Sequence, residues 1–198
     1  MKSLEEYLTL AAERHKHLCP GQVLGVRMAM LGLASLGIAD PEANARRLVT
    51  FVEIDRCATD AVSVVTGCSL GRRSLKYVDY GKVAATFVDL ETGVAIRVCA
   101  RDDSRVKAKE MFPEIAKPYR QQLEAYKVMK DSDLFTVQNV TVTLPPEDLP
   151  GGPRSRVACD LCGEGINNGR EIRREGRVLC RACAGEGYYK AVSKMNPQ

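Results

Sequence analysis

The stretch His15-Lys16-His17-Leu18-Cys19-Pro20-Gly21 contains both histidines of the chain, and a cysteine lies two residues after the second one. Imidazole and thiolate groups bind transition metals and take part in acid–base and nucleophilic chemistry near neutral pH. Pro20 is favourable at the first position of a helix, because its missing N–H has no helical partner there. We therefore expect Cys19 at the start of a helix whose dipole favours its thiolate form. The alternative is a turn in which the histidines only cap or pack.

Helical and strand patterns surround this stretch. Helical apolar periodicity predicts helices over residues 3–16, 21–36 and 57–66. The second helix is apolar on all sides, which is typical of a buried helix. Runs rich in β-branched residues predict strands over residues 47–53, 75–78, 82–90, 94–99 and 135–144, the last being a core strand.

Residues 104–131 are expected to form helices that are broken at Pro113 and Pro118. The order of these elements predicts the α+β fold class, with a helix–strand–helix–three-strand core. The sheet is expected to be mixed, because its last strands are joined by hairpins.

Residues 145–153 contain four prolines and two glycines, which is typical of a linker. The sequence therefore predicts an α+β domain over residues 1–150 and a small zinc-binding module over residues 155–198. The net charge of the chain is +4, and all of the excess lies after residue 150. This small excess is only a weak signature for nucleic-acid binding, so a nucleic-acid partner is not expected.

We infer the compartment from the lack of a targeting pattern and from the use of cysteine. The chain contains no uncharged apolar run of about 20 residues, and its first residues lack the pattern of a signal peptide. We therefore expect a cytoplasmic protein that does not enter a membrane. In that compartment eight cysteines point to metal binding or catalysis rather than to disulfides.

The strongest motif lies near the C-terminus, where two Cys-x-x-Cys pairs are separated by 17 residues. The four cysteines are Cys159, Cys162, Cys180 and Cys183. This spacing is typical of a structural zinc site. A knuckle, a hairpin and a helix running through Tyr188, Tyr189, Ala191 and Val192 would form a treble-clef arrangement. Four thiolates leave no open coordination position, so this zinc should stabilise the module. Two independent redox pairs are the alternative.

A second signal lies where the strand over residues 47–53 gives way to a helix. Cys57 is expected at the N-terminus of that helix, where the dipole lowers a thiol pKa, and Asp60 follows one turn later. Asp60 could orient a partner or provide an oxygen ligand. The alternative is a buried cysteine beside a helix-capping aspartate.

The sequence leaves the roles of three further residues open. Cys68 is either a third thiol near the site or a core residue. Lys82 is either a cation for an anionic substrate or a solvated lysine at the sheet edge, and Tyr80 is either a proton donor or a packing ring.

These motifs together resemble the FmdE family, which is associated with formylmethanofuran dehydrogenase. The resemblance rests on the His-x-His-x-Cys-Pro-Gly stretch with its apolar helix, on Cys57 after a strand, and on the turns at residues 66–68 and 79–82. It implies the α+β core above, a homodimer, and a metal or reactive-cysteine site in a cleft. It also implies a molybdenum or tungsten enzyme partner that moves one-carbon units onto methanofuran. Many members lie outside methanogens, so the family alone does not fix the reaction.

Carried onto this chain, the resemblance assigns His17, Cys19 and Cys57 to the core site as catalytic residues and metal ligands. His15 and Asp60 are further members of the ligand set. Nitrogen and sulfur ligands with an open position suit zinc, which could polarise a bound water or substrate. The expected function is that of an enzyme or oxidoreductase subunit acting on a small molecule. The alternatives are a zinc-finger module that docks a protein or nucleic acid, and a non-catalytic sensor or carrier of metal or one-carbon units.

Overall fold

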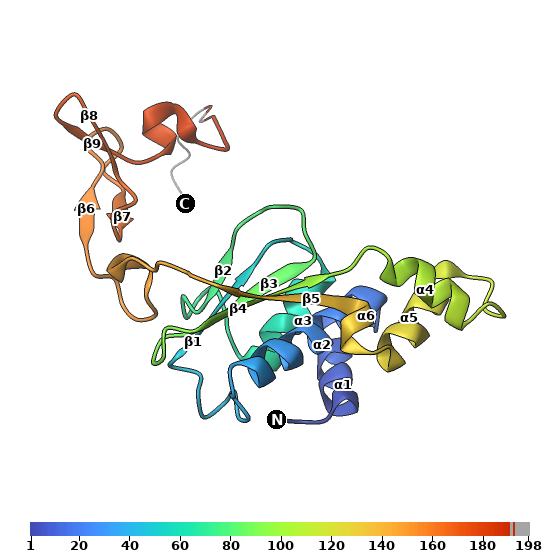
Figure 1. The fold of residues 1–198 in the computed structure, drawn as a ribbon. Helices are drawn as coiled ribbons and strands as arrows, with labels where there is room; N and C mark the ends of the chain where they lie inside the picture. Colours follow the sequence, from blue (N-terminus) through green and yellow to red (C-terminus); the bar gives the residue numbers. More distant parts are fainter. Residues whose placement is uncertain (191, 193–198) are drawn as a thin grey trace. The chain divides into compact units, whose positions relative to one another are not determined.

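A computed structural model describes residues 1–190 and 192 of the chain (Figure 1). The chain divides into two compact units, Met1–Thr143 and a second unit that begins at Leu144. The domain limits predicted from the sequence, 1–150 and 155–198, stay predictions. No helix in the described part of the chain is long and apolar enough to cross a membrane.

The first unit begins with two helices that meet at the His/Cys stretch. Helix α1 (Leu4–His15) starts at a capping box, in which the Ser3 hydroxyl accepts from the Glu6 N–H and the Glu6 carboxylate accepts from the Ser3 N–H. Helix α2 (Pro20–Ser35) starts at Pro20, as expected. Almost every turn of α2 is buried, which confirms the prediction made from its apolar composition.

A mixed sheet of five strands packs against these helices, which confirms the predicted α+β class (Figure 1). The strands are β1 (Leu48–Val52), β2 (Leu75–Tyr77), β3 (Ala84–Asp89), β4 (Ala95–Ala100) and β5 (Phe135–Val140), in the spatial order β2-β1-β3-β4-β5. Strand β1 pairs with β2 in parallel, and the other pairs are antiparallel. Because β1 and β2 run in the same direction, helix α3 (Cys57–Thr66) forms the crossover between them.

Close backbone contacts fix α2 between α3 and the sheet. A Cβ at Gly25 would lie 2.3 Å from the carbonyl oxygen of Ala58 on α3, and one at Gly32 would lie 2.1 Å from the ring of Phe87 on β3. Only glycine allows approaches this close. The buried core of the first unit is centred on this contact.

Three helices connect β4 to β5: α4 (Ser104–Met111), α5 (Pro118–Val128) and α6 (Asp131–Leu134). The helical stretch over residues 104–131 is broken at Pro113, after α4, and at Pro118, where α5 begins, as expected. Strand β5 differs from the prediction of a core strand, because it lies at the edge of the sheet and four of its six side chains are exposed. The alternation of its residues defines a strand but not its place in the sheet.

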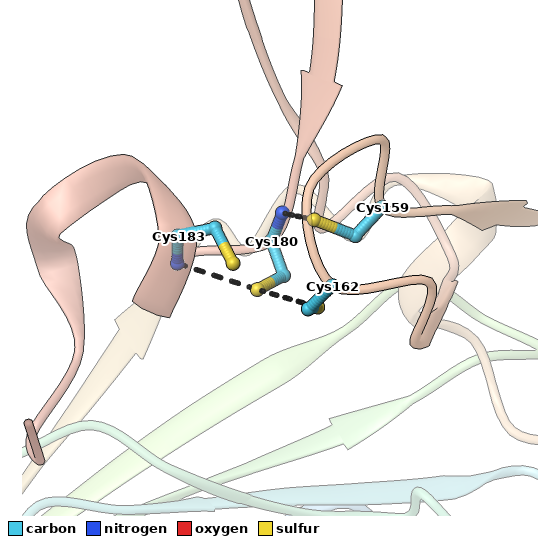
Figure 2. Close-up of side chains that lie close together, drawn as sticks. All are labelled: Cys159, Cys162, Cys180 and Cys183. Carbon is cyan, nitrogen blue, oxygen red and sulfur yellow. Dashed lines mark hydrogen bonds between the residues drawn. The ribbon is translucent and has the colours of Figure 1, made fainter. Parts of the chain in front are cut away.

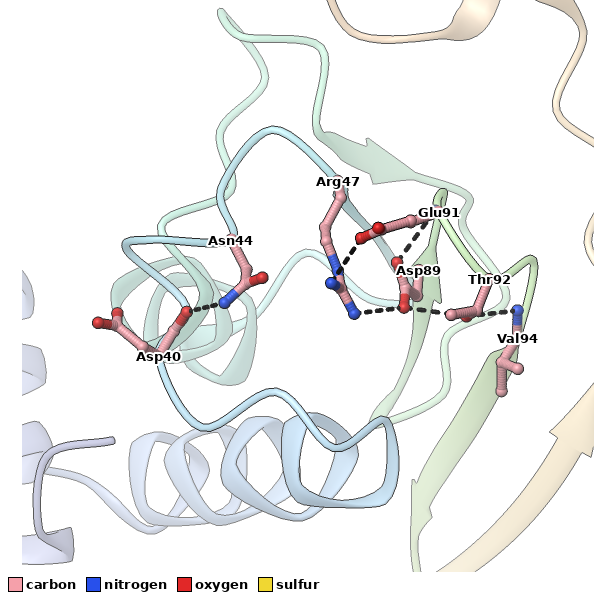
Figure 3. Close-up of polar contacts among 7 residues, drawn as sticks. All are labelled: Asp40, Asn44, Arg47, Asp89, Glu91, Thr92 and Val94. Atoms are coloured by element: carbon pink, nitrogen blue, oxygen red, sulfur yellow. Dashed lines mark hydrogen bonds and ion pairs between the residues drawn. The ribbon is translucent and has the colours of Figure 1, made fainter.

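A polar network joins the start of β1 to the β3–β4 hairpin (Figure 3). Arg47 contacts Asp89 at 2.7 Å and Glu91 at 2.6 Å, and the Thr92 hydroxyl donates to Asp89 at 2.9 Å. Burial alone would raise the pKa of Asp89, but the hydrogen bonds from Glu91, Thr92 and Arg47 outweigh it and lower this pKa. We assign the network a structural role.

The second unit contains two short antiparallel pairs. Strand β6 (Arg156–Ala158) pairs with β7 (Gly165–Asn167), and β8 (Ile172–Arg174) pairs with β9 (Arg177–Leu179). A short turn at Pro146–Asp148 precedes them, and a helical turn at Ala182–Glu186 follows.

The predicted C-terminal helix was too long. Tyr188 and Tyr189 follow the helical turn and are not helical, and Ala191 lies outside the described residues. Gly185 has a φ of +88°, a conformation that ends a helix.

Candidate functional site

The chain reverses direction between α1 and α2 and brings three potential metal ligands together. Lys16 has a φ of +70°, which ends α1 directly after His15, and Cys19 occupies the N-cap of α2. The ligand atoms of His15, His17 and Cys19 all lie within 4.8 Å of one another. Cys19 is buried, His15 is half-buried and His17 is exposed, so the group reaches from the core to the surface.

Cys57, the first residue of α3, lies beside this group. Gly21 marks the contact, because a Cβ at that position would lie 3.3 Å from the Cβ of Cys57 and 3.8 Å from the sulfur of Cys19. The first loop and the start of α3 therefore converge. The structure places the two thiols on the same side of the core.

Asp60 contacts the site through His15. Its Oδ2 lies 3.2 Å from the Nδ1 of His15. A carboxylate in this place favours the tautomer with a proton on Nδ1, which leaves Nε2 free to bind a metal. Asp60 thus contacts His15 but lies outside the group of three clustered ligand atoms.

The Cys19 thiol differs from the sequence prediction. Burial raises its pKa, and the N–H groups of Gln22 and Gly21 only partly oppose the effect, while Cys57 raises it further. The helix dipole therefore does not by itself produce a thiolate here. A bound cation would stabilise the anion that burial disfavours.

Two residues near the site carry no sequence signal of their own. The Tyr119 hydroxyl donates to the carbonyl of Leu18 at 3.3 Å, and burial together with Cys19 and Cys57 raises the Tyr119 pKa. Gln22 is fully buried; its Nε2 donates to the Ala11 carbonyl at 2.9 Å, and its Oε1 has no partner among the described residues.

The remaining candidates lie outside the cluster. Cys68 is buried against Thr50 and the Leu48 carbonyl, which favours the core interpretation. Tyr80 is 65% exposed, and its ring is not packed in the core. Lys82 lies at the turn that leads into β3.

The four tail cysteines form a second cluster (Figure 2). Their sulfur atoms all lie within 4.8 Å of one another. The N–H of Cys180 donates to the sulfur of Cys159 at 3.3 Å, and the N–H of Cys183 donates to that of Cys180 at 3.4 Å. Backbone N–H groups of Cys162 and Cys180 lower the pKa of Cys159 to about 6. Donors aimed at sulfur are typical of thiolate sites that hold a metal.

Both clusters fit a metal ion by donor chemistry. Around one tetrahedral zinc, ligand atoms lie about 3.3–3.8 Å apart, so from separations within 4.8 Å a contraction of at most about 1.0–1.5 Å suffices. Four thiolates suit zinc, and two imidazoles with one thiolate suit a borderline-soft ion. The structure thus contains two groups that could hold a transition metal.

The fold and these clusters define a two-unit α+β protein with a His/Cys group in the first unit and a cysteine cluster in the second. A family model described as FmdE, molybdenum formylmethanofuran dehydrogenase operon, matches residues 14–139. This match covers more than half of the chain, and the chain belongs to the FmdE family. The family predicted from the sequence is confirmed.

Two relatives extend this comparison. A probable S-adenosyl-L-methionine-binding protein of Archaeoglobus fulgidus is 31% identical over 214 residues, which cover 96% of this chain and 56% of the relative. The chain thus spans about half the length of that curated relative. The crystal structure of a tungsten formylmethanofuran dehydrogenase FmdE-like protein from Syntrophus aciditrophicus matches with a TM-score of 0.62 and 24% identity, covering 96% of each chain. This likeness shows that the fold is shared.

Proposed function

We propose that this chain is a metal-binding FmdE-like protein whose first unit holds a zinc ion in an open site that binds or activates a small molecule. The convergence of His15, His17 and Cys19 within 4.8 Å carries the proposal. Three protein ligands with one position left open are typical of catalytic zinc sites.

The residues around the ion have separate roles in this proposal. Asp60 orients His15 through the 3.2 Å contact at Nδ1. Cys57 provides a second thiol beside Cys19 for ligation or nucleophilic attack. Tyr119 holds the ligand loop through the Leu18 carbonyl, and His17 stays exposed on the side from which a small molecule approaches. The bound ion supplies Lewis-acid polarisation of a water or carbonyl oxygen.

The tail cluster holds a second zinc whose role is structural. Its four thiolates fill a tetrahedral ligand set, and the described strands of the unit around it have three residues each. A module of this size needs such an ion for stability. We propose that it folds as a treble clef.

The cellular setting is part of the same proposal. The protein acts in the cytoplasm as a homodimer, as a subunit or relative of a molybdenum or tungsten formylmethanofuran dehydrogenase. Support comes from the family description, which names the operon of the molybdenum enzyme. The name of the Archaeoglobus relative adds S-adenosyl-L-methionine to the small molecules to be tested.

Metal analysis of the full chain tests the proposal. We expect two zinc equivalents in the wild type, of which His17→Ala removes the core ion and Cys162→Ser removes the tail ion. Cys68→Ser is the matched control, since Cys68 belongs to neither cluster, and it should retain both ions. Retention of both ions in His17→Ala and in Cys57→Ser would exclude the core site.

Small-molecule binding is tested on the same samples. Formylated amines and S-adenosyl-L-methionine are titrated into the zinc-loaded chain and into His17→Ala. We expect binding that is lost with the core ion. Equal affinity in both samples would contradict an open site that acts through its metal.

A further inference from the structure

A cavity of about 420 Å³ lies in the first unit. It is at the end of the sheet where the inner strands β1 and β4 end and β3 begins. Its charged wall consists of Lys82, Arg97, Arg101, Arg105 and Asp102. Its apolar wall includes Leu24, Ile54 and Tyr126. None of the proposed metal ligands lines it, so it is a feature separate from both cysteine clusters.

Two of the four cations are already neutralised. Arg97 donates to both carboxylate oxygens of Glu53 at 2.7 Å, and Glu53 is only 5% exposed. Arg101 donates to both oxygens of Asp103 at 3.0 Å. The largely buried pair with Glu53 fixes the Arg97 guanidinium as part of the wall, whereas the Arg101–Asp103 pair lies at the surface.

Lys82 and Arg105 remain as available charges. Within residues 1–190 and 192, neither side chain forms an ion pair with a carboxylate. The N–H of Lys82 donates to the carbonyl of Glu53 at 3.2 Å, which fixes the backbone of this lining residue. Arg105 lies in the first turn of α4. After the carboxylates of Glu53, Asp102 and Asp103 are set against the four cations, one positive charge remains in excess.

We propose that this cavity binds the anionic group, a carboxylate or phosphate, of a small molecule, with Lys82 and Arg105 as its direct contacts. The volume lies within the range of small-ligand sites, which is about 300–1,000 Å³. The carbon skeleton of the ligand packs against Leu24, Ile54 and Tyr126. Two cations on separate elements, one at a turn and one on a helix, select an anion that bridges them.

This inference deepens the proposed function and rests on it for the assignment of the ligand to the metal-bearing unit. The cavity and the core site share local structure: Ile54 lies three residues before Cys57, and the Thr59 hydroxyl of α3 donates to the Ile54 carbonyl. Leu24 lies in the second turn of α2, which begins directly after Cys19. Anionic small molecules are therefore the class to test at this cavity, which lies in the same unit as the core site.

The test uses the full chain in NMR titrations with inorganic phosphate and, separately, with succinate, at constant ionic strength. We expect shifts in the amide signals of residues 81–83 and 101–105. Loss of one charge-assisted contact in Lys82→Ala or Arg105→Ala should raise the dissociation constant about tenfold. Lys109→Ala is the matched control, because it removes the same charge from an exposed position of α4 that does not line the cavity.

The outcomes separate the anion site from its alternatives. A stronger response to phosphate identifies phosphate esters as the ligands, and a stronger response to succinate identifies carboxylates. Absence of shifts with both anions overturns the inference, as does an equal loss of affinity in Lys109→Ala. Retained binding in Cys57→Ser would support the anion site even if the metal proposal fails.

Discussion

The two clusters of potential metal ligands differ in how they are assembled. The tail cluster draws its four ligands from two Cys-x-x-Cys pairs, each within one local turn. The core cluster takes His15, His17 and Cys19 from one loop, and it depends on helix packing to bring Cys57 and Asp60 beside them. The hydrophobic core cluster lies within the first unit, and the described strands of the second unit have three residues each. In the second unit a metal is therefore a condition for folding, whereas in the first unit the packed fold is a condition for metal binding.

The largest effect is therefore expected in the tail. Cys162→Ser removes one of four thiolates and should unfold the second unit, since a structural zinc contributes about 10–16 kcal/mol of apparent binding free energy in small modules. The dispersion of the amide signals of the second unit in NMR spectra measures this loss of folded structure. The first unit should keep its dispersion and its core ion, and Cys68→Ser should change neither unit. A tail that stays folded in Cys162→Ser would show that its thiolates are not its main source of stability.

Helix packing should affect metal binding more strongly at the core cluster than at the tail cluster. Gly25→Ala places a Cβ 2.3 Å from the Ala58 carbonyl oxygen and forces α2 away from α3, which carries Cys57. We expect the free energy of unfolding to fall by up to about 2 kcal/mol, because overpacking costs about 1–3 kcal/mol and helix propensity returns up to about 1 kcal/mol. Urea unfolding measures the change in the free energy of unfolding, and the zinc content of the core site measures the effect of moving α2 away from α3.

A glycine in open space provides the control for this substitution. Gly71→Ala adds a Cβ that meets nothing within 4 Å at that position, so it should leave stability and both ions unchanged. If Gly25→Ala weakened the tail ion as strongly as the core ion, the distinction between the two clusters would fail.

The same distinction explains what could be predicted from the sequence. The tail cysteines were recognised from spacing alone, because their geometry is local. The strand–helix junction placed Cys57 at a helix N-terminus, and its grouping with Cys19 was implied by the family resemblance. The structure brings the two residues close together. Tyr119 was missed, since its place depends on how α5 packs against the first loop.

Two predictions made from the sequence were wrong, because the deciding factors depend on tertiary structure and not on the order of residues along the chain. The thiolate expected at Cys19 ignored burial, which raises the pKa and depends on the surrounding helices. Strand β5 was taken for a core strand, but an alternating pattern does not separate edge strands from central ones. The cavity at Lys82 likewise joins residues from distant segments, so Lys82 was the one cation of its wall that a local pattern could single out.

The effect confined to the smallest part of the molecule is expected at Asp60, which orients a ligand without belonging to the three clustered ones. Asp60→Asn keeps the size of the side chain but removes the charge that holds the Nδ1 proton of His15. Loss of such an outer contact costs about 10- to 100-fold in metal affinity. Competition with a zinc chelator measures this change in the core ion, and the tail ion is the internal control. Asp60→Glu should restore part of the affinity if orientation is the role, whereas a complete loss of the ion in Asp60→Asn would make Asp60 a direct ligand.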